Sequence, residues 1–503
     1  MDFVATADQI RSGKKPIFDG DDLSLEQARA FDKSDPVKHM RNEFIFPTKS
    51  SLKSKSLKTI AISTSTLADN GTTTAVSGDD EAGRQRAIYF GGNSLGLQSK
   101  ATRRYINAQL DTWASVGVNG HFVDLEDSPL VNWQDMAAQC ATQSADIMGA
   151  LPSEIVYMNT LTTNIHLMLA AFYRPTEKRH KIILEWKPFP SDYYAISSHL
   201  QWHKLDPAKS MVEVWPKEEN LYISTSQVLA TIDEHAEDTA LLLLPGIQYY
   251  SGQLFDIPTI TKYAQDRGIV VGWDLAHAAG NVDLKLHEWN VDFAMWCTYK
   301  YISAGPGSIG GAFVHERHGK VEWTSGDESE DGQPRPVFRP RLSGWYGGDK
   351  SVRFLMAKQF QPTPGAAGFQ IGNPSALDLA ALSGALSLFT EAGFGNLRNK
   401  SLVLTCYAEA MLNQILADEQ GTGKPAFTII TPADPAQRGA QLSVLLREGL
   451  LDKVQAEFAE EAIVCDKRKP DVIRVAPVPM YNSFEEVWRF MEVLRRALDI
   501  PRR

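Results

Sequence analysis

The sequence predicts an α/β protein with a large domain built on a mostly parallel sheet flanked by helices, followed by a smaller α+β C-terminal domain. Short apolar runs that are typical of strands alternate with helical patterns from about residue 87 to residue 375. After Ser375 the pattern becomes mainly helical, then gives short strands and a closing helix. At 503 residues the chain also exceeds what one hydrophobic core usually carries. We therefore expect more than one packed unit.

The N-terminal segment, residues 1–86, has a different texture. The stretch "SLEQARAFDKSD" begins with the N-cap residue Ser24 and predicts a short helix. Residues 48–86 are rich in Ser, Thr, Lys and Gly without a sustained apolar period, and we expect a mobile insertion there. The predicted organisation is thus 1–86, a large domain over 87–375 and a small domain over 376–503.

The alternation in the large domain follows a fixed order. The expected strands are "EIVYM", "KIILEW", "TALLLLPG", "IVVGWD" and "VDFAMWCTY", and the helices between them are "TTNIHLMLAAFY", "SDYYAISSHLQWH" and "DIPTITKYAQDRG". In the C-terminal region "ALDLAALSGALSLFTEAG", "SLVLTCYAEAMLNQILADE" and "SFEEVWRFMEVLRRAL" predict helices, and "FTIITP", "GAQLSVLL" and "VIRVAPVP" predict strands. Active sites of such sheets lie at the C-terminal ends of the strands.

Composition and charge point to a cytosolic protein that acts on a small molecule. The formal net charge is −10 and no Lys/Arg block forms a stripe with interleaved aromatics, which disfavours nucleic acid and anionic membranes as partners. The N-terminus lacks a basic region followed by an apolar one, and the longest apolar runs are too short to span a bilayer. The cysteines are scattered without a C-x-x-C pair, which argues against a zinc site or a disulfide framework: Cys140, Cys297, Cys406 and Cys465.

Three polar residues follow apolar strands. Lys300 ends the run "FAMWCTYK"; such a lysine usually extends to water, but a partly desolvated amine can form a Schiff base with a carbonyl compound. Asp274 ends "IVVGWD" and either caps the following helix or holds a protonated heterocyclic nitrogen. His277 is either a core histidine or a site residue, and Asp-x-x-His without a third ligand is weak evidence for a metal.

Two further segments suit a planar anionic ligand. Thr160, Thr162 and Thr163 stand where a helix follows a strand, and they are either simple N-cap residues or part of an anion site made by exposed backbone N–H groups. Phe189 lies between two prolines with Asp192 close behind, and its ring either packs in a loop or stacks on a planar ligand.

A literal G-x-G-x-x-G runs from Gly305 to Gly310, directly behind Lys300. In a dinucleotide site this motif lies between a strand and a helix, whereas here it precedes the strand-like run "GAFVHERH", and Pro306 removes a backbone donor. We therefore reject a nucleotide site and expect the glycines to let the backbone pass close to the ligand of the lysine. A phosphate site, a stacking ring, an aspartate and a lysine together match the needs of a pyridine aldehyde phosphate.

Several blocks resemble the kynureninase family of pyridoxal-phosphate enzymes, which has fold type I, that of aspartate aminotransferase. They are "YFGGNSLGLQ", "MNTLTTNIHLML", "KPFPSDYYAI", "WDLAHAAGNVDLKLHEWNVDFAMWCTYKY", "GFQIGNPS" and "IRVAPVPMYNSF". The resemblance extends from about Tyr89 to the C-terminus, in many separate blocks, which makes it specific.

The resemblance implies a role for each site residue. Lys300 would bind the pyridoxal 5'-phosphate covalently, and Asp274 would pair with its ring nitrogen. Tyr299 would be a third catalytic residue and would also contact the phosphate. Leu161, Thr162, Phe189, Asp192 and His277 would complete the cofactor site, with Trp345 and Asn373 coming from the neighbouring subunit of a homodimer. Ser94, His121 and Asn373 would contact the substrate, and Arg474 would bind its α-carboxylate.

The implied reaction is hydrolysis of L-kynurenine, or of 3-hydroxy-L-kynurenine, to anthranilate or 3-hydroxyanthranilate and L-alanine, within tryptophan catabolism and NAD biosynthesis. The same fold also supports aminotransferases and cysteine desulfurases, and a protein that binds the cofactor without turnover is a third alternative. A desulfurase would need a mobile reactive cysteine, whereas Cys140, Cys297 and Cys406 lie in core-like patterns.

Overall fold

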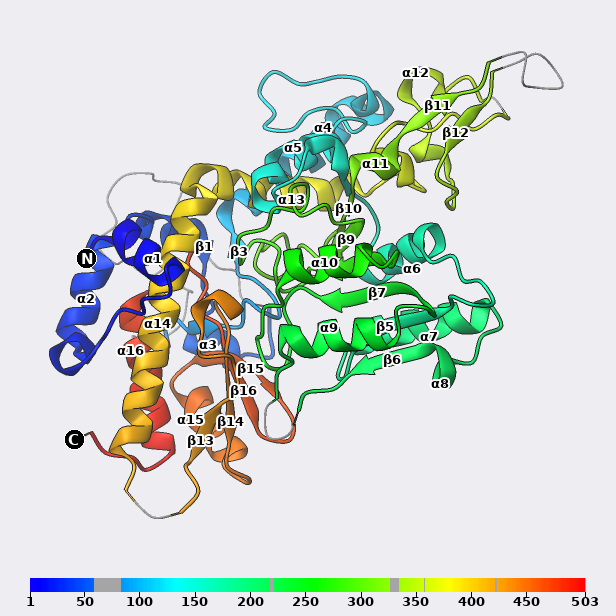
Figure 1. Cartoon of the computed structure of the whole chain (residues 1–503). Coiled ribbons are helices and arrows are strands. Elements are labelled where there is room, and N and C mark those ends of the chain that lie inside the picture. The colour runs from blue at the N-terminus through cyan, green and yellow to red at the C-terminus, as the bar shows by residue number, and fades with distance from the viewer. Residues whose placement is uncertain (58–82, 218–220, 326–333, 357, 421–422, 503) are drawn as a thin grey trace. The chain divides into compact units, whose positions relative to one another are not determined.

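The chain forms two compact units. The computed structural model describes residues 1–503 with the exception of 58–82, 218–220, 326–333, 357, 421–422 and 503 (Figure 1). One unit comprises Met1–Ala101, Tyr250–Gly252 and Glu391–Arg503, and the other comprises Thr102–Tyr249 and Gln253–Thr390. We call them the terminal unit and the central unit. The predicted domain boundaries at residues 87 and 376 stay predictions.

The central unit is built on a seven-stranded sheet of order β4-β10-β9-β8-β7-β5-β6. Only β10 runs antiparallel to its neighbours β4 and β9, while the remaining pairs are parallel. The strands are β4 (Ile155–Tyr157), β5 (Lys181–Glu185), β6 (Met211–Val214), β7 (Thr239–Pro245), β8 (Val270–Asp274), β9 (Phe293–Trp296) and β10 (Gly311–Val314). The prediction of a mostly parallel sheet is confirmed.

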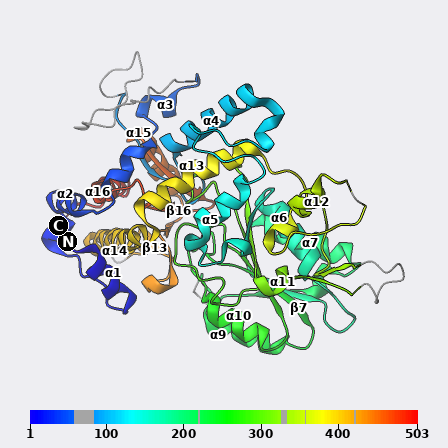
Figure 2. The same cartoon turned by 90° about the horizontal axis from the view of Figure 1, so that it is seen from above.

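Helices cover both faces of this sheet, with α6 and α7 on one side and α9 and α10 on the other (Figure 2). Alternate strand residues such as Leu241 and Leu243 pack against Ile165 and Leu169 of α6, as the two-residue period of a strand requires. The helices are α5 (Met136–Met148), α6 (Leu161–Phe172), α7 (Pro190–Trp202), α8 (Pro207–Ser210), α9 (Thr225–Glu234), α10 (Ile257–Gln265), α11 (Glu316–Gly319) and α12 (Lys350–Arg353), with α4 (Lys100–Val116) and α13 (Ala376–Ala392) at the ends; β11 (Val321–Trp323) and β12 (Pro336–Phe338) form a separate ribbon.

The terminal unit joins both ends of the chain in one α+β fold. Its five-stranded sheet has the order β13-β14-β16-β15-β2, with β2 parallel to β15 and the other pairs antiparallel. Its elements are β2 (Ile88–Phe90), β13 (Phe427–Ile429), β14 (Leu442–Leu446), β15 (Ile463–Arg468), β16 (Val472–Val475), the pair β1 (Phe44–Ile45) and β3 (Gln98–Ser99), α1 (Phe3–Arg11), α2 (Leu25–Ser34), α3 (Lys49–Lys53), α14 (Phe394–Asp418), α15 (Leu451–Glu460) and α16 (Phe484–Ala497).

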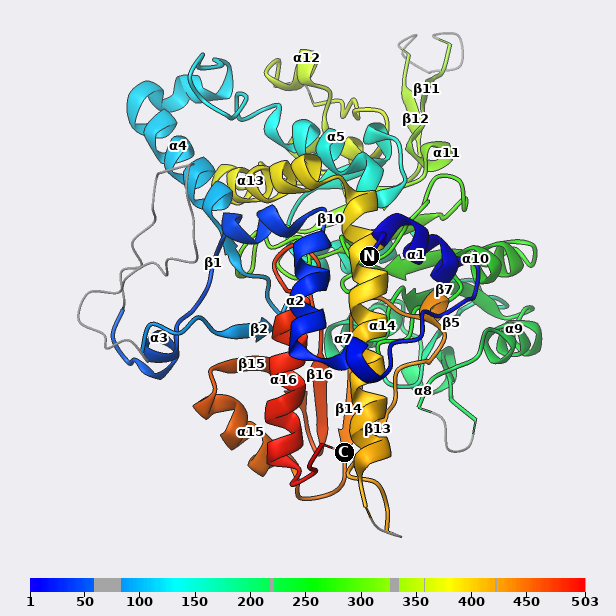
Figure 3. The ribbon, with the colours of Figure 1, turned by 90° about the vertical axis from the view of Figure 1, so that its left-hand side faces the viewer.

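Helices from opposite ends of the sequence pack together in this unit, where α2, α14 and α16 stand side by side (Figure 3). Ser24 caps α2 as predicted, accepting a hydrogen bond from the backbone N–H of Gln27. Asp32 of α2 accepts hydrogen bonds of 2.8 and 3.0 Å from the backbone N–H groups of Phe484 and Glu485 and so caps α16.

The insertion predicted over residues 48–86 lies mostly outside the described residues, since 58–82 are among those left out. Residues 49–53 differ from the prediction because they form α3. A capping box explains this helix: the Thr48 side chain accepts from the Ser51 backbone N–H, and the Ser51 side chain accepts from that of Thr48.

Among the described residues, no single helix is long and apolar enough to cross a membrane. The helices α13 and α14 reach the length and apolar composition of a membrane span only when they are counted together, and the chain bends by 78° between them.

One buried ion-pair network stabilises the terminal unit. Glu409 on α14 lies 2.7 Å from Arg438 and 3.1 Å from Lys15, and the side chain of Arg438 is 2% exposed. These contacts hold the pKa of Glu409 below its usual value in spite of burial, because Arg438 donates hydrogen bonds to its carboxylate. Within the described ranges of the chain, Glu409 is the one carboxylate that forms an ion pair with Arg438.

We predict that Glu409→Gln lowers the free energy of unfolding by about 3 kcal/mol, because it leaves the buried Arg438 guanidinium without a counter-charge. Urea unfolding followed by tryptophan fluorescence measures the change. Glu460→Gln is the matched control in the same unit, since its exposed pair with Lys53 should leave the midpoint unchanged. Equal midpoints for wild type and both variants would contradict the prediction.

Candidate active site

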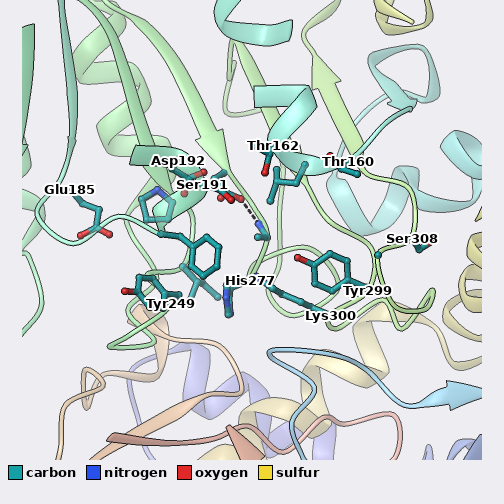
Figure 4. A pocket seen from close by; sticks show the side chains of 17 residues that line it. Thr160, Thr162, Glu185, Ser191, Asp192, Tyr249, His277, Tyr299, Lys300 and Ser308 are labelled. Atoms are coloured by element: carbon teal, nitrogen blue, oxygen red, sulfur yellow. Dashed lines mark hydrogen bonds between the residues drawn. The ribbon is translucent and has the colours of Figure 1, made fainter. Parts of the chain in front are cut away.

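A cavity of about 240 Å³ opens at the C-terminal edge of the central sheet (Figure 4). Its walls come from the ends of β4, β5, β7 and β8 and from the connection between β9 and β10. The lining residues are Thr160, Leu161, Thr162, Glu185, Phe189, Ser191, Asp192, Pro245, Ile247, Tyr249, Asp274, Ala276, His277, Tyr299, Lys300, Gly307 and Ser308. This is the edge at which parallel sheets bind ligands.

Eight of the predicted site residues meet in this cavity: Leu161, Thr162, Phe189, Asp192, Asp274, His277, Tyr299 and Lys300. They come from four separate strand ends, so that only the sheet brings them together. Lys300 lies four residues after β9, with its Nζ atom 5.9 Å from the centre of the Phe189 ring and 6.0 Å from that of Tyr299. The amine therefore faces into the cavity between two aromatic rings.

The glycines behind Lys300 serve a close backbone approach. The motif precedes strand β10 rather than a helix, which agrees with the rejection of a nucleotide site. The N–H of Gly310 donates to the carbonyl of Asn159 at 2.7 Å, and its own carbonyl accepts from the Met158 N–H at 3.0 Å. A Cβ atom on Gly310 would lie 3.0 Å from the backbone nitrogen of Leu161, so a larger residue would crowd the start of α6.

The start of α6 is suited to an anion. Thr160 is its N-cap residue, but its side chain makes no capping hydrogen bond and instead lies 3.1 Å from the Thr163 hydroxyl. The first N–H groups of a helix have no partner within the helix and carry a partial positive charge. Ser308 brings a buried hydroxyl oxygen without a hydrogen-bond partner among the described residues into the same cavity. A phosphate fits these donors.

Two buried carboxyl groups, Asp192 and Asp274, lie next to one another in the cavity. Burial raises the pKa of Asp192 well above its usual range, and the neighbouring Asp274 raises it further. Burial also raises the pKa of Asp274, but Lys300 and the Ala276 N–H, which donates to Asp274 at 2.7 Å, act in the opposite direction. Asp192 therefore takes the proton and Asp274 the negative charge, which suits a cationic heterocycle beside Asp274.

Three other predicted residues of the central unit lie outside the lining of this cavity. Trp345 is 48% exposed, and its ring lies edge-on to that of Phe354 with centroids 5.7 Å apart. Asn373 is exposed, and His121 is half-buried with its ring against Trp133. The exposed positions of Trp345 and Asn373 are those expected of residues that act on a neighbouring subunit, a role that stays a prediction.

Ser94 and Arg474 belong to the terminal unit, where they contact each other. Arg474 is 1% exposed and donates to the Ser94 hydroxyl at 2.9 Å, and both side chains contact Asp466. Asp466 on β15 lies directly opposite Arg474 on β16 in the antiparallel register. Sequence reasoning missed Asp466, because only the pairing of the two strands reveals that it accompanies the arginine.

Glu185 and Tyr249 are also lining residues that the sequence reasoning did not select. The signal for Glu185 was present, since it ends the apolar strand "KIILE" just as Asp274 ends its own strand. Figure 4 shows Glu185 and Ser308 on opposite sides of the cavity, with His277 and Lys300 between them.

One group of possible metal ligands lies elsewhere in the central unit. Glu154, His287 and His315 bring ligand atoms within 4.8 Å of one another. Glu154 already accepts hydrogen bonds from the backbone N–H groups of Leu151 and Glu316 and from His287. These bonds account for the cluster, and we assign no ion to it.

Two family models match separate parts of the chain. The family model described as "Aminotransferase class-V" matches residues 129–326, and the model "Kynureninase C-terminal domain" matches residues 397–494. A protein named Kynureninase 1 from Neurospora crassa is 62% identical over 498 residues, which cover 99% of each chain. A protein named Kynureninase from Pyricularia oryzae is 60% identical over 96% of each chain.

Solved structures show the fold. The C-DES protein with glycine linked to its PLP cofactor superposes with a TM-score of 0.64 at 17% identity, over 82% of this chain and 97% of that one. A cysteine desulfurase from Thermococcus onnurineus gives a TM-score of 0.60 at 16% identity, over 82% of this chain and 95% of that one. At these identities the likeness concerns the fold alone.

We predict that Asp192→Asn makes the stability of the ligand-free protein fall less as the pH rises. Because the pKa of Asp192 is raised in the folded protein, its contribution to stability is present at low pH and is lost as the pH rises through the folded pKa. The stability of the variant relative to wild type should therefore increase as the pH is raised from about 4, near the pKa of an unfolded aspartate, to about 8.

Thermal and urea unfolding across this pH range measure the difference. Asp111→Asn on the exposed face of α4 is the control and should follow wild type at every pH. A constant difference between Asp192→Asn and wild type across the range would refute the assignment of the proton to Asp192.

Proposed function

The chain belongs to the kynureninase family, and from that premise we propose that it is a pyridoxal-phosphate enzyme that hydrolyses L-kynurenine or 3-hydroxy-L-kynurenine to the corresponding anthranilate and L-alanine. The observation that carries this proposal is the meeting of Lys300, Asp274, Phe189 and the start of α6 in one cavity. Each of these groups fits a different part of the cofactor.

The residues present fit pyridoxal phosphate. Lys300 would bind the aldehyde carbon, the charged Asp274 would hold the protonated ring nitrogen, and Phe189 would stack on the ring. The first N–H groups of α6, at Leu161 and Thr162, would bind the phosphate together with Tyr299. Asp192, with a buried oxygen that lacks a hydrogen-bond partner among the described residues, and His277 would flank the ring. When bound, the cofactor supplies an electron sink for a carbanion formed next to the substrate amine.

Lys300 and Tyr299 would then move the protons. The free amine of Lys300 would remove the proton from the substrate Cα atom and return it elsewhere. Burial raises the pKa of Tyr299 above its usual value, so that its hydroxyl keeps its proton and can donate it. Lys300 and the Ala276 N–H favour the charged form of Asp274, which would stabilise a protonated ring nitrogen and so favour the acceptance of electrons.

Bond cleavage needs one water molecule. Its oxygen bonds to the side-chain ketone carbon, the Cβ–Cγ bond breaks, and the electron pair remains with Cβ, which takes a proton. The aryl fragment leaves as anthranilate with the new carboxylate, and the amino-acid fragment leaves as alanine. Kynurenine and water therefore balance the two products without an oxidant or reductant.

Arg474 would bind the substrate α-carboxylate, and Ser94, His121 and Asn373 would contact the rest of the substrate. An arginine suits this role because its planar fork binds a carboxylate in two places. Asp466 supports it by holding the guanidinium, which is 1% exposed, in a charged and oriented state.

The alternatives within the same fold fit less well. A cysteine desulfurase needs a reactive thiolate, whereas burial raises the pKa of Cys140 and of Cys465 to about 12 and also raises that of Cys297 and Cys406. The relatives at 60% identity and above carry the name kynureninase rather than that of an aminotransferase. A non-catalytic binding protein would have no need of the half-buried Tyr299 beside Lys300.

We further propose a cytoplasmic homodimer that acts in tryptophan catabolism and NAD biosynthesis. Support for the homodimer comes from exposed aromatic side chains that lie side by side in the central unit: Phe122 is 58% exposed and Phe354 47%, and their centroids are 5.5 Å apart. Trp345 continues this cluster, and an apolar surface of this kind favours contact with a second copy of the chain. Trp345 and Asn373 would then reach the site of the partner.

We predict that Lys300→Ala abolishes both the visible absorbance band of the bound cofactor and the release of anthranilate, because the amine is lost that binds the aldehyde and moves the proton. Absorbance spectra and anthranilate fluorescence after addition of L-kynurenine, and then of the 3-hydroxy form, measure the two effects. Lys262→Ala on α10, where the lysine is 76% exposed, is the control and should keep both. If wild type shows the absorbance band but releases no product from either substrate, the proposed reaction is refuted and the binding of the cofactor stands.

We predict that two inactive variants, Lys300→Ala and Trp345→Ala, restore activity when they are mixed as subunits. In a heterodimer with shared sites, one site carries both substitutions and the other carries neither, so that about a quarter of all sites become intact after random exchange. Co-expression with two affinity tags and an assay of the doubly tagged dimer measure this. Activity no higher than that of either parent would exclude a site that contains Trp345 of the partner subunit.

A further inference from the structure

The carboxylate of Glu185 is an unusual member of the cavity lining. It ends β5, it is 1% exposed, and no ion pair of Glu185 is found within the described part of the chain. Burial of a carboxylate without a counter-charge is unfavourable and is retained where hydrogen bonds hold the group in a defined place. The steps proposed above give Glu185 no role.

Glu185 joins two loops through a closed set of hydrogen bonds. One of its oxygens accepts from the backbone N–H of Lys187 at 2.7 Å, and the other accepts from the side-chain amide of Gln248 at 3.2 Å. The same amide nitrogen of Gln248 donates to the carbonyl of Lys187 at 3.2 Å. Gln248 is 3% exposed, so water competes little for these bonds.

Each loop carries an aromatic ring that lies next to the other. Phe189 follows Lys187 by two residues, Tyr249 follows Gln248 directly, and their ring centroids are 5.4 Å apart at an angle of 85°. Phe189 is 43% exposed, so core packing does not by itself fix its ring. The hydrogen bonds of Glu185 lie at the base of both loops and restrict the backbone that carries both rings.

We propose that Glu185 and Gln248 are positioning residues that together hold the ring of Phe189 in the orientation needed to stack on the pyridine ring of the cofactor, with the ring of Tyr249 edge-on against it. This inference rests on the proposed function in one respect, namely that the cavity binds pyridoxal phosphate. It concerns the pre-organisation of the site rather than the chemical steps.

The charge of Glu185 makes this arrangement pH-dependent. Burial raises the pKa of Glu185 to about 7, Glu213 on β6 raises it further, and the Lys187 N–H, the Gln248 amide and the Lys187 charge lower it. Asp192 on α7 also faces Glu185. A protonated carboxyl has one oxygen that carries hydrogen and cannot accept from both N–H donors equally well. The two loops are therefore held most firmly above about pH 7.

The test is a titration of the apoprotein with pyridoxal phosphate, followed by visible absorbance and by the circular dichroism of the bound cofactor. We expect Glu185→Gln, whose amide group meets that of Gln248 donor to donor, to raise the dissociation constant about three- to tenfold and to weaken the induced dichroism. Gln248→Met should have a similar effect. Because the two residues act as one unit, the double variant should bind pyridoxal phosphate no more weakly than the single variant with the lower affinity.

Glu213→Gln is the matched control, since it removes a nearby charge on the adjacent strand without touching these hydrogen bonds, and at about pH 8, where Glu185 is charged, it should bind like wild type. The difference between wild type and Glu185→Gln should shrink as the pH is lowered from about 8 to about 6, because protonation removes the same acceptor. Thermal unfolding of each variant distinguishes two causes of weaker binding. Local loosening of the loops leaves the midpoint unchanged, whereas a loss of the fold lowers it.

Dissociation constants and dichroism of Glu185→Gln and Gln248→Met that equal those of wild type would overturn the proposal, as would effects that simply add in the double variant. These outcomes differ from a failure of the proposed function. A wild-type protein that binds the cofactor but releases no anthranilate would remove the reaction and leave the positioning role intact. A wild-type protein that binds no cofactor would remove both.

Discussion

The candidate site depends on two backbone hydrogen bonds, those that join Gly310 to Met158 and Asn159. Through them the connection that follows Lys300 lies against the turn that begins α6, so that an amine and a helix N-terminus from distant parts of the chain face one cavity. Strand β10 makes this possible because it runs antiparallel between β4 and β9. Without that single reversed strand, the two segments would have no shared hydrogen bonds.

The cavity concentrates unfavourable charge before any ligand arrives. Asp192 and Asp274 are both buried, their mutual repulsion raises the pKa of Asp192, and Glu185 adds a third buried carboxyl group. A cationic ring relieves this repulsion, and Lys300 relieves part of it already. Binding sites commonly hold such groups against the preference of the fold, because the ligand provides the missing charge.

Sequence reasoning located the strand ends whose side chains line the cavity of the candidate site. Strand β8 is short and apolar and ends in Asp274, and Lys300 follows the apolar strand β9 by four residues, so that both could be identified from a local pattern. Asp466 could not, because its importance arises from its register opposite Arg474. The partner of β2 was equally hidden, since three residues carry no information about pairing with β15, more than 370 positions later. Local patterns specify elements, whereas contacts between distant elements need the fold.

The union of both chain ends in the terminal unit bears on how the protein is made. Strand β2 and the α16 cap supplied by Asp32 both need partners from the C-terminal part of the sequence. During synthesis β2 and α2 must therefore wait until residues 463–485 have left the ribosome, by which time the central unit already has all the strands of its sheet. Such long-range pairing is slow and leaves apolar surface exposed. The sheet of the terminal unit is thus completed after that of the central unit, although its first strand is synthesised earlier.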